Sequence, residues 1–509
     1  MKTHIPSSCQ KKYQRLLELI QETEDISAAL ALLDWDQETY MPRHAADGRA
    51  AQAATLSKIL HEKETAPEYE ALLQEFPLEV LPPESPEAYM IRELRKSLEQ
   101  EKRIPASLVG KMAEQEAKTQ NRWLEAKEKS DYRIVQKELG EMIRLKQEYT
   151  SLFPEFANPY DCLLDEYEDG MTCQRLEQIF EPVRQELPVI LQQIMEKQKQ
   201  KEQNNPDDLF RNQRFDPERQ MDFCRKILTN MGYNWNQGRL DLTEHPFTTS
   251  FGLQDVRITT KILENNPLSC LFSCIHEGGH ALYEQNIDPV FNRTPMADGA
   301  SLGFHESQSR LWENFIGRSE AFWTAFYPAM QKCFPEQLNP VSLNAFMAAV
   351  NQVVPSMIRT EADEVTYNLH ILLRYDLEKA IFLDHVSVTD LPELWRQKMK
   401  QYLNIVPAND REGILQDVHW YCGLFGYFPT YALGNLIAAA LMEKIQQESP
   451  QVLQVISQGK LQPLKEYLCR ELYCSGASAS PADTWKRLFG PEPLTGNAFL
   501  RYLKQKYLK

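Results

Sequence analysis

The chain has 509 residues, of which 42% are hydrophobic and 25% charged, and its Asp and Glu outnumber Lys and Arg by 72 to 56. This composition can form a large hydrophobic core and excludes a disordered protein. The net charge of −16 favours solubility and argues against nucleic acid or an anionic membrane as the main partner.

The N-terminal segment, MKTHIPSSCQKK, is polar and lacks the apolar stretch of a signal peptide. The longest apolar run near the C-terminal end, residues 435–442, is too short to span a bilayer. Ten cysteines are scattered along the chain without a CxxC pair. Because reduced thiols are typical of the cytoplasm, we expect a cytoplasmic protein.

Apolar residues at three- and four-residue spacing predict that most of the chain is α-helical. The predicted helices are 10–34, 86–103, 107–151, 174–203, 341–383 and 431–458. One region differs, because residues 247–262 are rich in β-branched side chains and alternate along the chain. There Val256 and Ile258 would face one side of a strand and Arg257 the other. We therefore expect a small β-hairpin within a mainly α-helical fold.

The segment after this hairpin contains an HExxH motif formed by His276, Glu277 and His280. Residues four apart share one face of a helix, so both imidazoles can bind one metal ion. Glu277 projects beside them, where it can take a proton from metal-bound water. Asn266 and Pro267 predict the start of this helix, as a cap followed by proline at the first helical position. The alternative is a pair of ordinary core histidines.

Two cysteines in the same apolar segment admit two interpretations. Cys270 and Cys274 lie four residues apart. Such a pair could bind a metal ion, but buried free thiols are the favoured interpretation.

A catalytic zinc ion needs a third protein ligand and one open position for water. Residue 286 is Asn, so the HExxHxxGxxH continuation is absent. The next candidate is Glu306, in a second apolar helical segment further along the chain. Two histidines and a downstream glutamate form the thermolysin-like ligand set. Taken alone, Glu306 could equally pair with Arg310 on a solvent-exposed face.

Several motifs in this order make the chain resemble the carboxypeptidase Taq family of zinc metallocarboxypeptidases. The resemblance covers essentially the whole chain. The matching segments are LLDWDQETYMP (32–42), HPF (245–247), DVRIT (255–259), HEGGH (276–280), HESQ (305–308), IRTEAD (358–363) and GILQDVHW (413–420).

The resemblance implies a large, single-domain helical peptidase (residues 1–509) with a deep central cleft, a small β-sheet beside the HExxH helix and, usually, a homodimer. It implies release of single C-terminal residues from peptides with broad specificity, proline being disfavoured. Zinc is the expected metal, one ion per chain, and cobalt serves in some relatives. The N-terminal helices could form a lid over the cleft.

Roles for other residues follow from the chemistry of a carboxypeptidase. The substrate's free carboxylate calls for an arginine, and Arg359 is the first candidate, Arg411 the second. For Arg359 the alternative is a salt bridge to Asp363 on its own helix.

Hydrolysis passes through an oxyanion, for which His419 and Tyr427 are the expected donors and Tyr431 the competing tyrosine. His245 and Arg257 are expected to contact the substrate, and the strand that carries Arg257 could pair with an extended peptide.

An acidic residue commonly lies four positions after the ligand glutamate in thermolysin-like sites, where it orients a histidine. Position 310 is arginine in this chain, so another residue must supply that contact, and Asp363 is a candidate.

Two other functions remain open at this stage. An oligoendopeptidase or dipeptidyl carboxypeptidase could use the same ligands, and a non-catalytic zinc-dependent scaffold could bind peptides. The intact Glu277 argues against the scaffold, which needs no base at that position.

Overall fold

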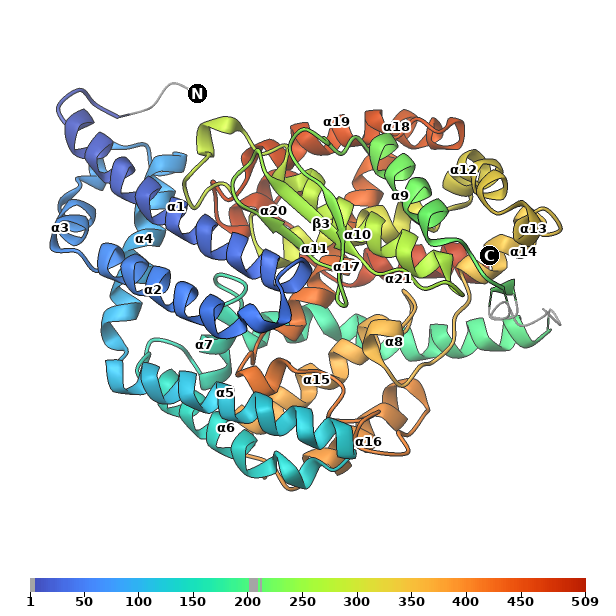
Figure 1. The fold of residues 1–509 in the computed structure, drawn as a ribbon, viewed down its shortest axis with the longest axis horizontal. Helices are drawn as coiled ribbons and strands as arrows, with labels where there is room; N and C mark the ends of the chain where they lie inside the picture. Colours follow the sequence, from blue (N-terminus) through green and yellow to red (C-terminus); the bar gives the residue numbers. More distant parts are fainter. Residues whose placement is uncertain (1–4, 201–208, 211–212) are drawn as a thin grey trace. The chain divides into compact units, whose positions relative to one another are not determined.

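The computed structural model describes residues 5–200, 209–210 and 213–509, and most of these are helical (Figure 1). The described residues form two compact units, each assembled from segments that are distant in the sequence. Unit 1 comprises the described residues of Met1–Gln100, Asn205–Val350 and Lys444–Pro491, and unit 2 those of Glu101–Asn204, Asn351–Glu443 and Glu492–Lys509. The expectation of a single domain stays a prediction.

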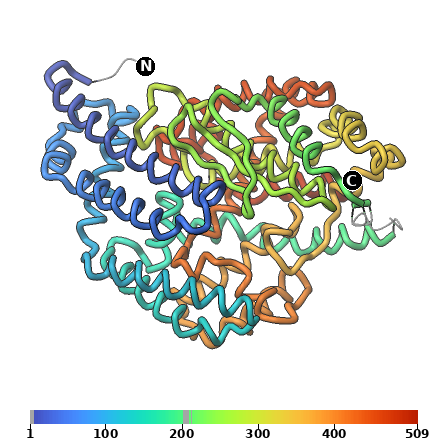
Figure 2. Tube along the Cα trace, viewed as in Figure 1, coloured from blue at the N-terminus to red at the C-terminus, as the bar shows by residue number. Residues whose placement is uncertain are grey.

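Unit 1 contains the sheet and the helices around it. Its helices are α1 (Gln10–Thr39), α2 (Ala46–Glu64), α3 (Pro67–Glu75), α9 (Pro217–Met231), α10 (Pro267–Glu284), α11 (Leu302–Arg310), α12 (Glu320–Cys333), α13 (Pro335–Leu338), α14 (Leu343–Val350), α18 (Pro450–Gln454), α19 (Gln462–Glu471) and α20 (Pro481–Phe489). A π-helical segment, Leu311–Gly317, continues α11. The trace in Figure 2 shows α1 and α2 side by side, in agreement with their contacts.

Unit 2 is helical throughout its described regular elements. Its helices are α5 (Ala106–Lys129), α6 (Gln136–Thr150), α7 (Pro159–Asp165), α8 (Cys173–Gln200), α15 (Tyr367–Phe382), α16 (Leu391–Leu403) and α21 (Asn497–Leu503). Two of the boundaries between the units fall within helices, one in α4 (Pro86–Arg103) and one in α17 (Phe428–Glu448).

The small sheet has three strands in the order β1-β3-β2, with bounds Leu240–Leu242 for β1, Thr248–Ser250 for β2 and Val256–Thr260 for β3. β2 and β3 form the expected antiparallel hairpin, in which Thr248 pairs with Ile258. β1 runs parallel to β3 and was not predicted, because three residues are too few to show a period. β3 contacts α10, so the sheet lies beside the HExxH helix as expected (Figure 1).

α10 begins as the sequence predicts. The side chain of Asn266 accepts a hydrogen bond from the backbone N–H of Ser269, and Pro267 occupies the first helical position. Most of its residues are buried, because α9, α11 and β3 all pack against it. A helix that is apolar around most of its circumference is stable only in such an enclosed position.

The two glycines in HEGGH explain how closely α10 is packed. A Cβ on Gly279 would lie 2.6 Å from Ser309 Cα and 2.7 Å from the carbonyl oxygen of Gln308, both on α11. A Cβ on Gly278 would lie 2.5 Å from a methyl group of Leu228 on α9. The backbone of α11 leaves no room for a larger residue at 279, whereas at 278 the Leu228 side chain would have to move, so the glycines let the two neighbouring helices approach α10 from different sides.

Three of the predicted helices are shorter in the structure. The predicted helix 107–151 divides into α5 and α6, because Ser130 adopts a left-handed conformation at the end of α5. The predicted helix 341–383 divides into α14 and α15, and Pro355 lies in the loop between them. The predicted helix 431–458 is interrupted at Pro450, where α18 begins. Residues 201–203 of the predicted helix 174–203 lie outside the described residues.

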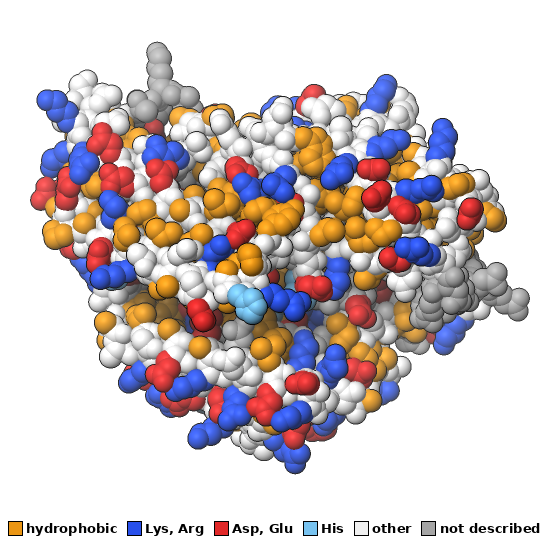
Figure 3. Space-filling view, in the orientation of Figure 1, with side chains coloured by type: hydrophobic (Ala, Val, Ile, Leu, Met, Phe, Trp, Pro, Cys, Tyr) orange, Lys and Arg blue, Asp and Glu red, His pale blue; other side chains and the backbone are white. Residues whose placement is uncertain are grey.

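Acidic and basic side chains are interspersed on the face shown in Figure 3, so the excess of negative charge is not gathered in one patch there. Within the described part of the chain, no helix combines the length and apolar character that crossing a membrane requires.

Candidate metal centre

Three donor side chains converge between α10 and α11 in unit 1. Glu306 Oε2 lies 3.6 Å from His276 Nε2 and 3.3 Å from His280 Nε2. Ligands held about 2.0–2.1 Å from a tetrahedral zinc ion are about 3.3–3.4 Å apart. Three such atoms at these separations leave the fourth tetrahedral position open, so the donor set fits a catalytic divalent ion.

Glu306 is buried and uses both of its carboxylate oxygens. Oε1 accepts a hydrogen bond of 2.6 Å from Arg310 Nε, while Oε2 accepts one of 2.9 Å from the Ser309 hydroxyl and faces the two imidazoles. The pairing with Arg310 and the approach to the histidines are therefore both present, although the sequence suggested them as alternatives. Burial by itself would raise the pKa of Glu306, but Arg310 and His276 outweigh it and hold the pKa well below its usual range.

The second nitrogen of His276 is held by Glu313, which sequence analysis missed. His276 Nδ1 lies 2.9 Å from Glu313 Oε2, and this carboxylate also pairs with Arg310 and Arg318. Burial opposes ionisation, but the contact with His276 and the two arginines lower the pKa of Glu313 to about 2. Glu313 lies in the π-helical segment, seven residues after Glu306.

Glu313, rather than Asp363, contacts the outer nitrogen of His276. A carboxylate on the outer nitrogen of a ligand histidine fixes its tautomer and ring orientation. The expectation for Asp363 was wrong, because its carboxylate accepts hydrogen bonds from the backbone N–H groups of Val354, Val365 and Thr366. These contacts stabilise the loop that leads into α15.

We expect Glu313→Gln to weaken zinc binding by about 10- to 100-fold, because the amide orients His276 less firmly than the carboxylate. Competition with a chromophoric zinc chelator measures this affinity. Glu320→Gln, an exposed change at the start of α12, is the matched control and should leave it unchanged. Equal affinities in all three proteins would show that Glu313 has no part in metal binding.

Glu277 is buried beside the same group and is oriented by β2. The Thr248 hydroxyl lies 2.7 Å from Glu277 Oε2 and 3.0 Å from the backbone carbonyl oxygen of Glu277. Because β2 pairs with β3, the sheet fixes Thr248 and thereby the carboxylate. The small sheet therefore positions the Glu277 carboxylate. The contact made by Thr248 was not recognised from the sequence.

A second set of predicted residues lies in unit 2, around Asp417. Arg359 Nε and Nη2 lie 3.1 and 2.9 Å from Asp417 Oδ1, and Arg359 Nη1 donates to the Tyr367 hydroxyl at 2.8 Å. Arg374 Nε donates to the other oxygen of Asp417 at 2.7 Å. Burial would raise the pKa of Asp417, but Arg374 and Arg359 outweigh it and hold the pKa well below its usual range.

This arrangement corrects the alternative proposed for Arg359. Its ion-pair partner is Asp417 rather than Asp363, and residues 359 and 363 do not share a helix. The reason is that the chain between α14 and α15 is a loop with one short 3₁₀ turn, Arg359–Glu361. An i,i+4 pair on one helix was therefore not available.

His419 lies in the same unit beside the two predicted tyrosines. Its Nε2 lies 3.4 Å from the Tyr431 hydroxyl, and its ring centroid is 5.5 Å from that of Tyr427. Burial lowers the pKa of His419 to about 4; Arg359 and Arg374 act in the same direction and Asp417 opposes them. The imidazole is therefore neutral at neutral pH and keeps one N–H donor.

The remaining predicted residues are less enclosed. His245 and Arg411 are exposed, in unit 1 and unit 2 respectively. Arg257 is half-buried; it pairs with Asp255 at 2.8 Å and lies over the ring of Trp35 at 4.3 Å. The expectation that its strand accepts a peptide was wrong, because β3 is the central strand and its two edges already pair with β1 and β2.

A mainly helical fold, an HExxH helix and a glutamate on the next helix together define a metal-dependent peptidase. The family model of the carboxypeptidase Taq (M32) metallopeptidases matches residues 15–507. The chain belongs to this family, and it is a metallocarboxypeptidase.

Individual relatives span almost the whole chain. It is 38% identical to "Carboxypeptidase 1" of Bacillus subtilis, with 97% of each chain covered. It is 39% identical to "Thermostable carboxypeptidase 1" of Thermus thermophilus, with 97% of this chain and 98% of the relative covered. The crystal structure of the M32 carboxypeptidase from Deinococcus radiodurans is similar with a TM-score of 0.93 at 36% identity, covering 98% of this chain and 99% of the other.

Proposed function

We propose that the protein is a zinc-dependent carboxypeptidase that releases single C-terminal amino acids from peptides with broad specificity, proline being disfavoured. The observation that carries this proposal is the convergence of His276, His280 and Glu306 beside the buried carboxylate of Glu277. Membership of the metallocarboxypeptidase family supplies the class of reaction.

Zinc is the proposed ion because two imidazoles and one carboxylate with an open position form the donor set of catalytic zinc sites. Cobalt could occupy the same donors. When bound, the ion supplies Lewis-acid chemistry, which acidifies a water molecule and polarises the scissile carbonyl.

Glu277 is the proposed general base. Its carboxylate accepts a proton from the attacking water and then transfers that proton to the leaving amine. The hydroxyl of Thr248 at 2.7 Å supports this role, because it fixes one carboxylate oxygen and leaves the other for the proton.

His419 and Tyr427 are the proposed donors to the oxyanion that forms at the attacked carbonyl. The low pKa of His419, about 4, supports this role because a neutral imidazole with one N–H can donate without carrying a charge. Tyr431, whose hydroxyl lies 3.4 Å from His419 Nε2, is proposed to contact the substrate and to hold the imidazole.

Arg359 is the proposed anchor for the substrate's free carboxylate. Bidentate recognition requires a guanidinium whose plane is fixed. The contacts with Asp417 and Tyr367 fix that plane, which supports the assignment. Arg411, His245 and Arg257 are proposed as further substrate contacts.

A peptide with an amidated C-terminus distinguishes this function from an endopeptidase. We expect the amide to be cleaved at least about 100-fold more slowly than the free acid, because loss of charge-assisted hydrogen bonds costs roughly 3 kcal/mol. Mass spectrometry of the first products makes the measurement. Release of dipeptides, or equal cleavage of both peptides at internal bonds, would reject single-residue release.

Three properties of the whole protein are proposed on other grounds than the site: the family resemblance implies the homodimer and the single domain, and the reduced thiols favour the cytoplasm. We propose a homodimer, a cytoplasmic location and a single domain whose N-terminal helices cover the active site. Light scattering of the zinc-loaded protein tests the first of these, and a monomer at all concentrations would contradict it.

A further inference from the structure

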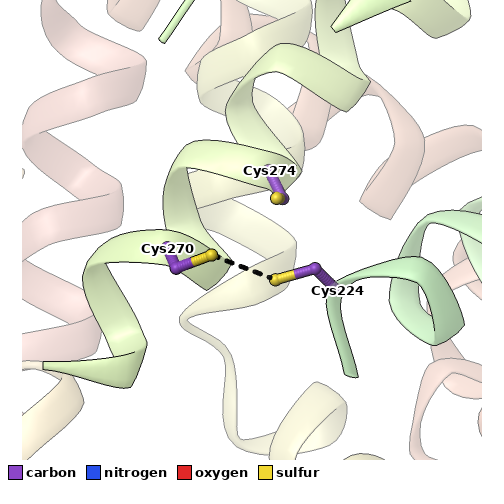
Figure 4. Close-up of side chains that lie close together, drawn as sticks. All are labelled: Cys224, Cys270 and Cys274. Atoms are coloured by element: carbon purple, nitrogen blue, oxygen red, sulfur yellow. Dashed lines mark hydrogen bonds between the residues drawn. The ribbon is translucent and has the colours of Figure 1, made fainter. Parts of the chain in front are cut away.

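Three buried cysteines converge at the contact between α9 and α10, apart from the proposed zinc ligands. Cys224 comes from α9, and Cys270 and Cys274 come from α10 (Figure 4). Their sulfur atoms all lie within 4.8 Å of one another, and those of Cys224 and Cys270 are 3.7 Å apart. Each of the three side chains is at most 1% exposed.

This cluster occupies a different face of α10 from the HExxH histidines. Cys270, Cys274 and Gly278 are four residues apart and form one stripe, and the Cβ position of Gly278 faces Leu228 of α9. His276 follows Cys274 by two residues, which is about 200° around the helix. α10 therefore presents its imidazoles to α11 and its thiols to α9, so the two groups are separate.

Close helix packing alone does not require cysteine at these positions. Cysteine acts as a small apolar residue in many cores, and alanine or glycine would permit the same approach of α9. Packing also does not require three sulfur atoms from two helices to point at one another. In Figure 4 the side chains of Cys270 and Cys274 point toward the sulfur of Cys224.

The sulfurs of Cys224 and Cys270, which share a thiol hydrogen bond, are as far apart as two thiolates on one metal ion, and the sulfur of Cys274 lies within 4.8 Å of both. With metal–sulfur bonds of about 2.3 Å, sulfurs are about 3.8 Å apart at a tetrahedral ion and about 4.0 Å apart at a trigonal one. The observed 3.7 Å lies close to the first of these, and the upper bound of 4.8 Å allows small rotations to close the set. Among the described residues the group has three members, which favours a three-coordinate ion.

We propose that Cys224, Cys270 and Cys274 form a second metal site that binds one monovalent copper ion through three thiolates. Thiolates are soft ligands that select soft ions, and Cu(I) accepts three of them without a fourth ligand. Burial excludes water and oxidants from the ion. As the Cu–S bonds form, each thiol that becomes a ligand releases its proton to solvent, and no electron is transferred.

Thr260 supports the proposed site from β3. Its hydroxyl donates to the backbone carbonyl oxygen of Cys270 at 3.2 Å and lies 3.7 Å from Cys270 Sγ. Its single proton is within reach of either acceptor, so the hydroxyl can donate to the sulfur instead of the carbonyl when Cys270 is a thiolate. Copper bound here links α9 to the helix that carries HEGGH, so we expect it to raise the Tm of the protein.

The test uses the zinc-loaded protein, so that His276, His280 and Glu306 are occupied before copper is added. Cu(I) is supplied anaerobically with a chromophoric Cu(I) chelator as competitor, and bound copper and retained zinc are both counted. We expect one copper per chain, full retention of zinc and a thiolate-to-copper charge-transfer band. Cys224→Ser and Cys274→Ala should each weaken copper binding by at least about 100-fold.

Cys162→Ser is the matched control, because Cys162 is a buried cysteine outside this cluster. It should bind copper as the wild type does, and melting curves of all three variants show whether each is folded. Four results would overturn the proposal: no copper retained by the wild type, copper that displaces zinc, copper bound by Cys224→Ser or Cys274→Ala as tightly as by the wild type, or a loss in the Cys162→Ser control as large as in those two variants.

Discussion

Replacing Glu277 by glutamine is expected to lower kcat by about 10²- to 10⁴-fold while the metal content and KM change little. Glutamine has nearly the same shape as glutamate and keeps an oxygen for the Thr248 hydroxyl, but it cannot accept the proton of the attacking water. The measurement is steady-state hydrolysis of an unblocked peptide by both proteins, each loaded with one zinc ion per chain.

Glu264→Gln serves as the control for Glu277→Gln. Glu264 is an exposed residue in the turn before α10, where it pairs with Arg214 at 2.6 Å, and its loss should leave kcat unchanged. If Glu277→Gln hydrolysed peptides as fast as the wild type with the same zinc content, the proposed general base would be wrong. A scaffold that only binds peptides would show negligible hydrolysis in both proteins.

Replacing Glu306 by glutamine is expected to weaken zinc binding by at least about 100-fold and to reduce activity in proportion to the zinc lost. The change removes the charge of the proposed anionic ligand, which faces both imidazoles at 3.3 and 3.6 Å. It also removes the charge that pairs with Arg310 at 2.6 Å, so we expect a lower Tm as well. Zinc retained after dialysis against a weak chelator measures the first effect and thermal melting the second.

Glu284→Gln is a matched control for Glu306→Gln. Glu284 is also a buried glutamate, and it pairs with an imidazole, that of His305, at 3.0 Å. Its loss should lower stability, and because the His305 ring stacks on that of His280 at 4.5 Å it should lower the zinc affinity by no more than about 10-fold. If both variants lost zinc affinity to the same extent, the loss of any buried carboxylate near α10 would explain the effect, and coordination by Glu306 would not be needed.

The elements of the site that are local in sequence could be predicted. The spacing of His276 and His280 places both imidazoles on one face of a helix whatever surrounds it. The start of that helix at Asn266 and Pro267 is likewise a local property of capping, and it was predicted correctly. The segment 247–262 was recognised because β-branched residues alternate there, and its hairpin is present.

The partners of these residues could not be predicted in the same way. Glu313 contacts His276 from the segment that follows α11, and the sequence does not show which neighbouring element this carboxylate meets. Asp417 pairs with Arg359 across 58 positions of the chain, whereas the sequence offered the nearer Asp363. The contact of Thr248 with Glu277 depends on β2 lying beside α10.

The sequence by itself determined that the chain is mainly helical, that it carries an HExxH helix and that its motifs resemble those of one metallocarboxypeptidase family. Each of these depends on spacing within a short segment, where the geometry of the helix or strand fixes which side chains share a face. Only the tertiary structure decided that Glu306 contacts both Arg310 and the imidazoles, that β3 is a central strand and that Cys224 meets Cys270 and Cys274. The physical reason is that these contacts join residues from different elements, and packing between elements, rather than any local preference, brings them together.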